Sequence, residues 1–249
     1  MSAQPTSASQ FTPVRFLATG AQRYGDATGV AAPWADYRHV QLDPVLGQRI
    51  SAAYMAAPAW DQRALPAYRA FCDETIAQFH FLTGTRGRGP VRRTRGRGLD
   101  PLCRTRGRGL DPLGVTVEVV DYDPYETAQA MAADLRRRRL RVYSTRASGN
   151  PHPYLSDAVN DMFRAVHDAF GHAASGRGFD QDGEEAAWLK HCAMYSPLAR
   201  RALTTETRGQ SCALLFHYQG RRFPGQKLAL LPEWCGDPPR TNPTPMPMS

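Results

Sequence analysis

Histidine and acidic residues gather in one stretch of this chain more densely than anywhere else along it. Residues 160–172 read NDMFRAVHDAFGH and hold His167, Asp168 and His172. The residues that follow add further candidate ligands: Glu184, Glu185, His191 and Glu206. Imidazole nitrogens and carboxylate oxygens are the donors that proteins offer to zinc, iron and other transition metals. The stretch therefore predicts a metal site.

The spacing of the two histidines restricts the kind of site they can form. His167 and His172 are five positions apart, and side chains at that spacing on a straight α-helix point about 140° away from each other. A helix that ends or bends at Gly171 would let His172 turn back toward His167, because glycine tolerates the left-handed conformation that terminates helices. The HExxH zinc-protease motif is excluded, since it spaces its histidines by four and places a glutamate after the first.

The segment His-Asp-Ala-Phe-Gly-His at 167–172 resembles the H-[DE]-x-x-G-H iron motif of the pterin-dependent aromatic amino acid hydroxylases. The likeness implies a mononuclear Fe(II) held by His167, His172 and a later glutamate, for which Glu206 in Leu-Thr-Thr-Glu is the counterpart. Such a 2-His-1-carboxylate site leaves coordination positions open for oxygen and substrate. The likeness further implies a hydroxylase or other monooxygenase, a small aromatic substrate, a pterin cofactor and a mainly helical fold. Ala173 departs from the Val-Pro that usually follows the motif, and no pterin-binding segment matches.

Four polar residues are candidates for catalysis: Asp168, Glu184, His191 and Arg208. Asp168 would brace a metal ligand or a neighbouring helix. Glu184 or His191 would handle protons or orient the ligands, because metal-binding histidines usually need a second hydrogen-bond partner. Arg208 would pair with Glu206 or grip an acidic or amide group of the substrate.

Two other functions fit the same residues. A divalent-metal-dependent hydrolase is the second hypothesis, because His167 and Asp168 form the His-Asp pair with which HD-type phosphohydrolases bind metal, and His152 is an upstream histidine. A non-catalytic protein is the third hypothesis. In it the histidines are structural and an arginine-rich loop at 85–114 binds nucleic acid.

Positive charge is concentrated in that loop. Residues 85–114 hold nine arginines and two aspartates, so they carry +7 of the net charge of +8, and the rest of the chain is nearly neutral. The loop contains TRGRGLDPL at 94–102 and again at 105–113. Gly and Arg at this density cannot bury enough apolar surface to offset the entropy of ordering. Without interleaved aromatics the loop also lacks stacking platforms for RNA. We therefore expect a solvated insertion, and a nucleic-acid partner only through this loop.

Composition limits the class of protein. The chain has 249 residues and 42% hydrophobic content, which is typical of one soluble domain with an appendage. No apolar run approaches the ~20 residues that span a bilayer, and no apolar signal-peptide core begins the chain. The five cysteines are scattered, odd in number and without a CxxC pair, which favours a reducing compartment. We therefore expect a cytoplasmic protein with a small-molecule substrate and no membrane partner.

The order of patterns along the chain predicts its architecture. We expect a flexible arm at 1–29, a single catalytic-type domain at 30–235 interrupted by the insertion at 85–114, and a Pro-rich tail at 236–249. Helices are predicted at 44–55, 64–82, 124–138, from Ser156 through the histidine motif, at 182–194 and from Pro197, and strands at 115–122 and 140–145. The connection between the two strands is long enough for a crossover. The expected fold is α+β, mainly helical with a small β-sheet, built around the metal site.

Overall fold

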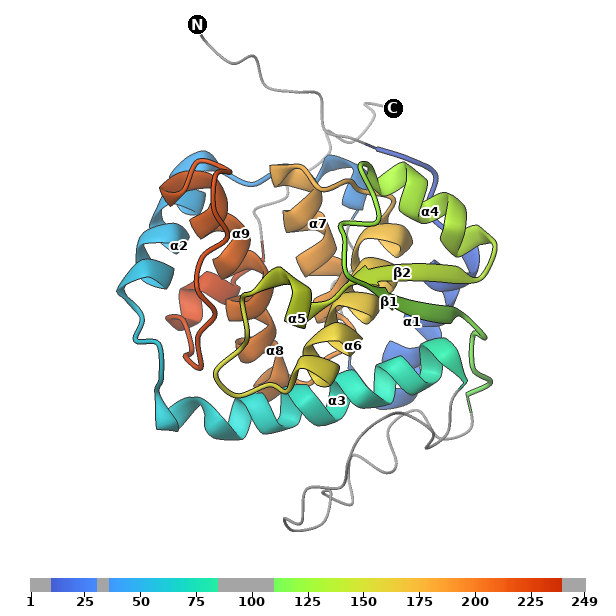
Figure 1. Cartoon of the computed structure of the whole chain (residues 1–249), viewed down its shortest axis with the longest axis horizontal. Coiled ribbons are helices and arrows are strands. Elements are labelled where there is room, and N and C mark those ends of the chain that lie inside the picture. Colours follow the sequence, from blue (N-terminus) through green and yellow to red (C-terminus); the bar gives the residue numbers. More distant parts are fainter. Residues whose placement is uncertain (1–9, 31–35, 85–109, 239–249) are drawn as a thin grey trace, which may run out of the picture.

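The computed structural model describes residues 10–30, 36–84 and 110–238. Its α-helices are α1 (Arg15–Thr28), α2 (Pro44–Ala56), α3 (Leu65–Thr83), α4 (Ala128–Arg136), α5 (Thr145–Ser148), α6 (Asp157–His167), α7 (Gln181–Cys192), α8 (Pro197–Thr204) and α9 (Gln210–Cys212). Its strands are β1 (Thr116–Val120) and β2 (Arg139–Tyr143). Helices surround α6, and the two strands lie with α4 at one side of the molecule (Figure 1). The prediction of a mainly helical fold with a small sheet is confirmed.

Short helical turns connect or extend the main helices. The 3-10 turns are η1 (Tyr37–His39), η2 (Gln62–Ala64) and η6 (Glu233–Gly236), and the π-helical turns are η3 (Asp168–Ala173), η4 (Thr205–Gly209) and η5 (Ala213–His217). A π turn is bonded from each residue to the fifth one along, and such turns occur frequently at functional sites. Both η3 and η4 carry residues that the sequence marks as candidate ligands.

The small sheet consists of two parallel strands joined by a crossover through α4. Thr116 pairs with Arg139 and Val120 pairs with Tyr143. Thr127 begins α4 by accepting a hydrogen bond from the Ala130 N–H at 3.2 Å, as N-cap residues do. The predicted strand–helix–strand unit is therefore confirmed.

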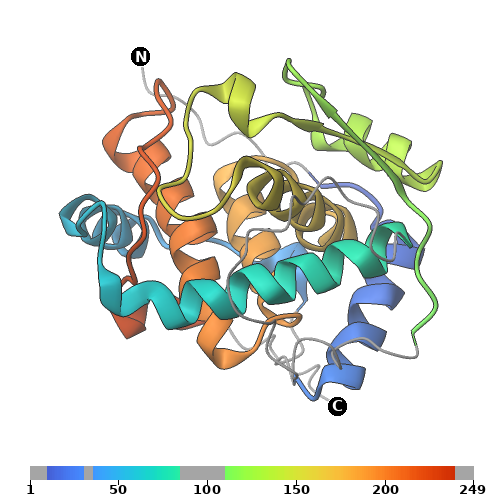
Figure 2. The same cartoon turned by 60° about the horizontal axis from the view of Figure 1, so that its bottom comes forward.

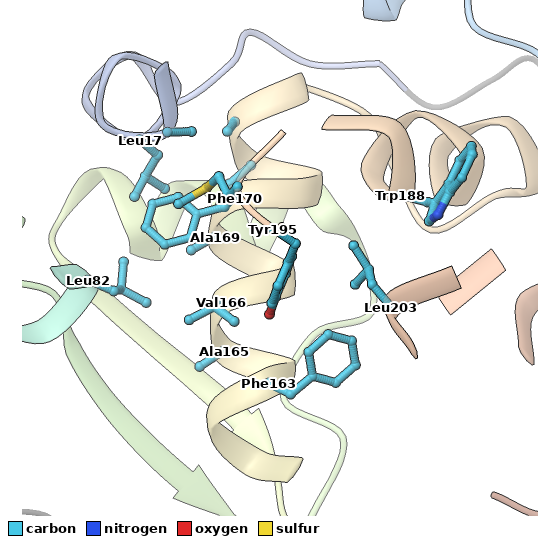
Figure 3. Close-up of a cluster of buried hydrophobic side chains, with 14 of the residues drawn as sticks. Leu17, Leu82, Phe163, Ala165, Val166, Ala169, Phe170, Trp188, Tyr195 and Leu203 are labelled. Carbon is cyan, nitrogen blue, oxygen red and sulfur yellow. The ribbon is translucent and has the colours of Figure 1, made fainter. Parts of the chain in front are cut away.

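The core is built on the apolar face of α6 and its continuation, η3. Phe163, Val166 and Phe170 are buried there, and Figure 3 shows them with Tyr195 and Leu203 directed into one cluster. The long α3 crosses the molecule next to α6 and also packs on α8 (Figure 2). Each such side chain contributes about 1.5–3 kcal/mol when fully buried. This packing holds the end of α6, where the histidine motif begins, in place.

The N-terminal region differs from the flexible arm predicted at 1–29. The described part of it forms α1, in which Leu17 and Tyr24 are buried in the main core. The high content of small residues, which suggested looseness, instead permits close packing. A Cβ at Gly20 would lie 2.8 Å from the Leu113 side chain. The first nine residues lie outside the described part.

The insertion predicted at 85–114 is described only at its end. The Leu113 N–H donates to the Phe81 carbonyl at 2.8 Å, and the Val115 N–H donates to the Leu82 carbonyl at 2.9 Å. The last Leu-Asp-Pro-Leu of the repeat therefore lies against the end of α3. Residues 85–109 lie outside the described part, as does most of the predicted tail, from 239 onward. Among the described residues, no helix has the length and apolarity to cross a bilayer.

Candidate metal centre

A π-helical turn brings the two motif histidines together. His167 ends α6, His172 lies in η3, and their ring centroids are 5.1 Å apart. The sequence suggested that the helix ends or bends at Gly171, but the structure shows no such break. The helix continues as a π turn, in which residues five apart lie above one another. Gly171 matters because it is small: a Cβ there would lie 3.1 Å from both the Ala187 carbonyl oxygen and His167 Nδ1.

Glu184 supplies the carboxylate that lies beside these histidines. Ligand atoms of His167, His172 and Glu184 all lie within 4.8 Å of one another. Glu184 is in the first turn of α7, which packs against η3, and its Oε1 is 3.5 Å from His172 Nε2. Ligand atoms bonded at about 2.1 Å to one ion are up to about 4 Å apart. A small contraction would therefore let the three side chains share an ion.

A chain of hydrogen bonds sets the tautomer of His167. The Gln78 amide donates from Nε2 to the Met194 carbonyl at 3.1 Å, so its Oε1 accepts the 2.8 Å bond from His191 Nε2. His191 then carries its proton on Nε2, and its Nδ1 accepts from His167 Nδ1 at 3.2 Å. Burial lowers the pKa of His191 to about 3 and holds the pKa of His167 well below its usual value. Both rings are uncharged. His167 Nε2 therefore carries no proton, and its lone pair is free to bind a metal.

Hydrogen bonds orient His172 and Glu184 in the same way. His172 Nδ1 donates to the Arg177 carbonyl at 3.2 Å, so its Nε2 is a lone pair in the neutral ring. The Ser211 hydroxyl donates to Glu184 Oε2 at 3.1 Å and leaves Oε1 facing that lone pair. Two acceptors that face each other repel unless a proton or a cation lies between them. The donor set, two imidazoles and one carboxylate, fits a divalent transition metal.

The three side chains open onto a cavity of about 420 Å³. Its lining includes the aromatic residues Phe163, Phe179 and Phe223, and the motif residue Asp168. Within the described part of the chain the Asp168 side chain makes no hydrogen bond, and burial raises its pKa to about 7. A cavity of this size accepts a small molecule.

Glu206, the third ligand expected from sequence, lies outside this ligand group. It lines the same cavity from η4, where it accepts hydrogen bonds from Tyr68 at 2.5 Å, from Gln210 at 3.0 Å and from His152 at 3.2 Å. Two helices, α7 and α8, separate His172 from Glu206 along the chain. The first of them, α7, places Glu184 beside the histidines. The number of residues between a histidine and a glutamate does not determine which glutamate lies beside the two histidines in the fold.

The other candidate residues lie in three settings. His191 is a hydrogen-bond partner of His167, and Asp168 lines the cavity. His152, the upstream histidine of the hydrolase hypothesis, is buried on Glu206 and does not join the His167 and Asp168 pair. The His-Asp hydrolase arrangement therefore lacks its upstream histidine among the described residues.

Arg208 lies away from the cavity, in a buried ion pair. Its guanidinium donates to both carboxylate oxygens of Glu185, at 2.8 and 2.5 Å, and lies 4.0 Å from the Trp188 ring. It also donates to the Cys235 and Asp237 carbonyls, at 2.7 and 2.8 Å. These contacts give Arg208 a structural role and connect the C-terminal segment to α7.

Two residues that orient the ligands, Gln78 and Ser211, do not stand out in the sequence analysis. Gln78 lies on the same face of α3 as Phe71, Thr75 and Leu82. A polar side chain on an otherwise buried face is a signal that could have identified it, because such a group needs a partner. Ser211 follows a Gln in an ordinary helical segment and gives no comparable signal.

We compared the chain with protein-family models, with curated proteins and with solved structures, and none of them matches it.

Proposed function

We propose that this protein is a mononuclear non-haem iron enzyme, an oxygenase or hydroxylase that acts on a small molecule. His167, His172 and Glu184 would hold Fe(II). The observation that carries the proposal is that ligand atoms of two imidazoles and one carboxylate lie within 4.8 Å of one another at the wall of a cavity. The likeness of the 167–172 segment to an iron motif supports it.

The chain supplies positioning, and the ion would supply the redox chemistry. Two-histidine-one-carboxylate iron sites leave open positions at which dioxygen is activated. The bond from His167 to His191 keeps the His167 ring in the tautomer that can ligate. The Arg177 carbonyl does the same for His172, and Ser211 orients Glu184. Partners of this kind typically contribute 10–100-fold in metal affinity.

The same donors also occur in zinc hydrolases, so the identity of the metal is the decisive test. We would strip the full-length protein of metal, add Fe(II) anaerobically, and measure iron per chain and the shift in Tm. One iron per chain is expected. His172→Ala and Glu184→Ala should lower the affinity at least about tenfold. His39→Ala, on an exposed side chain, and Glu206→Gln should retain the iron.

Two results would change this proposal. Iron binding that survives both ligand substitutions would overturn the site. Zinc bound in preference to iron, without oxygen uptake when a reductant is added, would replace the oxygenase with a hydrolase. The pterin implied by the sequence is tested in the same assay: a pterin enzyme should take up oxygen with a tetrahydropterin and much more slowly with ascorbate.

A further inference from the structure

Glu206 is a buried carboxylate whose partners are uncharged. Its side chain is 1% exposed. Burial and the charge of Glu206 raise the pKa of Tyr68, so that hydroxyl keeps its proton and donates to the carboxylate. The Tyr154 and Leu155 N–H groups both donate to His152 Nδ1 at 2.9 Å. The single proton of that ring is therefore on Nε2, which faces Glu206, and the ring carries no charge.

Two basic side chains of this region are engaged elsewhere. The Lys227 ammonium donates to the Met55 and Ala57 carbonyls, and Arg208 is held by Glu185. Across the described ranges, the only basic side chain within ion-pair distance of Glu206 is the uncharged His152. A buried carboxylate without a positive partner is costly. Its position on a cavity wall suggests that the partner is a ligand.

Four carboxamides line the cavity with Glu206: Asn150, Asn160, Gln210 and Gln226. The Asn150 side chain donates its amide N–H to the main-chain carbonyl of Pro224 at 3.0 Å. The Gln226 side chain donates to the main-chain carbonyl of Asn150 at 2.7 Å. Gln210 donates to Glu206 at 3.0 Å. Carbonyl and carboxylate oxygens only accept hydrogen bonds, so the orientation of these three amides is determined.

The fourth amide, Asn160, is oriented by a neighbouring hydroxyl. The Thr145 hydroxyl gives its proton to Asp161 at 2.6 Å and must therefore accept from Asn160 Nδ2 at 3.1 Å. Asn160 is 3% exposed. In the part of the chain that the structure describes, none of the four amide oxygens has a hydrogen-bond partner. Each amide also keeps a second N–H, so the distinctive feature of this wall, among the described residues, is a carboxylate without a cation together with four unpaired amide oxygens.

We propose that this cavity binds an organic cation rich in N–H donors, an alkylamine or a guanidine, with its charged end on Glu206 and its N–H groups on the amide oxygens. The proposal rests on the proposed function, because it names the substrate class of the same cavity. A cation meets both needs of the wall: it neutralises the buried carboxylate and donates to unpaired acceptors.

Two arginines also line the cavity and do not replace such a ligand. Arg141 donates to Asp134 at 3.1 Å and lies over the Tyr125 ring. The charge of Arg164 acts on Asp168, at the metal end of the cavity. Neither forms an ion pair with Glu206.

The test uses four probes with the same butyl chain: n-butylammonium, n-butylguanidinium, n-butanol and butyrate. Calorimetric titration into the full-length, metal-free protein should show both cations binding at least tenfold more tightly than butanol, with butyrate weakest. Glu206→Gln should abolish this preference, and Glu118→Gln, on an exposed residue of β1, should keep it. Gln226→Met removes one amide oxygen and should weaken the cations severalfold.

Equal binding of butanol and the cations, or of butyrate and the cations, would overturn the inference. A preference that persists in Glu206→Gln would also overturn it. If that variant does not fold, Gln226→Met takes its place, and cation binding as tight as in the parent protein would then overturn the inference. Iron per chain is measured on the same preparations. A cation preference without iron binding would support this inference and refute the iron enzyme, and iron binding without the preference would do the reverse.

Discussion

Two buried glutamates in the described part of this fold have opposite surroundings: one is paired with a cation and the other is not. Glu185 forms a two-bond ion pair with Arg208, and the guanidinium of Arg208 lies over the Trp188 ring. Glu206 receives hydrogen bonds only from uncharged groups and opens onto a cavity. A carboxylate with its own cation is part of the structure, whereas one that lacks a cation and faces a cavity is available to a ligand. The contrast separates structural from functional charge.

The helix α7 contributes one glutamate to the cavity and the next one to the ion pair. Consecutive residues on a helix point about 100° apart, so Glu184 faces the motif histidines while Glu185 faces Arg208. Adjacent residues of the same type thus have different roles. The substitutions below test that division, beginning with the largest expected effect.

Removing the cation from the structural pair should have the largest effect on stability. Arg208→Leu leaves the Glu185 carboxylate buried and unpaired and releases two carbonyls of the C-terminal segment. We expect a loss of about 3–5 kcal/mol in the free energy of unfolding, measured by urea denaturation. The double variant with Glu185→Leu should recover most of that loss. A loss below about 1 kcal/mol in the single variant would contradict the structural role.

Crowding the π turn should affect the metal site more than the fold. In Gly171→Ala the new methyl group would press on His167 Nδ1 and the Ala187 carbonyl. We expect Fe(II) affinity to fall about 10–100-fold, as read from anaerobic titration. Gly225→Ala is the matched control, since a Cβ there meets nothing within 4 Å. Unchanged affinity in Gly171→Ala would argue against the close approach of His167 and η3.

Neutralising the unpaired carboxylate should change stability little. Glu206→Gln removes a buried charge without a cation while keeping an oxygen that can accept from Tyr68 and His152. We expect a change below about 1 kcal/mol, in either direction. Glu185→Gln, made for comparison, should cost more because it strips Arg208 of its partner. Equal costs in the two variants, measured by the same denaturation, would remove the distinction between these glutamates.

Shortening the repeat should have the smallest effect. Deleting residues 94–104 leaves one copy of TRGRGLDPL, so Leu113 keeps its place beside α3. Loop-closure entropy varies slowly with loop length, by about 0.6 kcal/mol per doubling. We therefore expect a shift in stability of about that size or less. Leu113→Asp is the contrast, since Leu113 packs on the main core. A large loss in the deletion variant would assign the first copy a structural role.

Periodic patterns predicted most of the described elements correctly. The helices at 44–56 and 65–83 and the crossover unit follow from repeating apolar residues, prolines and capping residues. Within the described residues the main error was the part of the flexible arm from residue 10 to 29, because Ala and Gly suggest looseness in a sequence and allow close packing in α1. Metal-binding residue types near His167 were recognisable, but the expected break at Gly171 was not what the chain uses.

The sequence by itself determined the elements, the two histidines and the supply of carboxylates around them, because local spacing controls secondary structure and composition controls the available donors. Only the tertiary structure decided which carboxylate faces His172. Glu184, Glu185 and Glu206 differ little in local context, and their roles depend on how α7 and η4 pack against η3. That packing depends on contacts between segments far apart in the chain, a property that no single stretch of sequence contains.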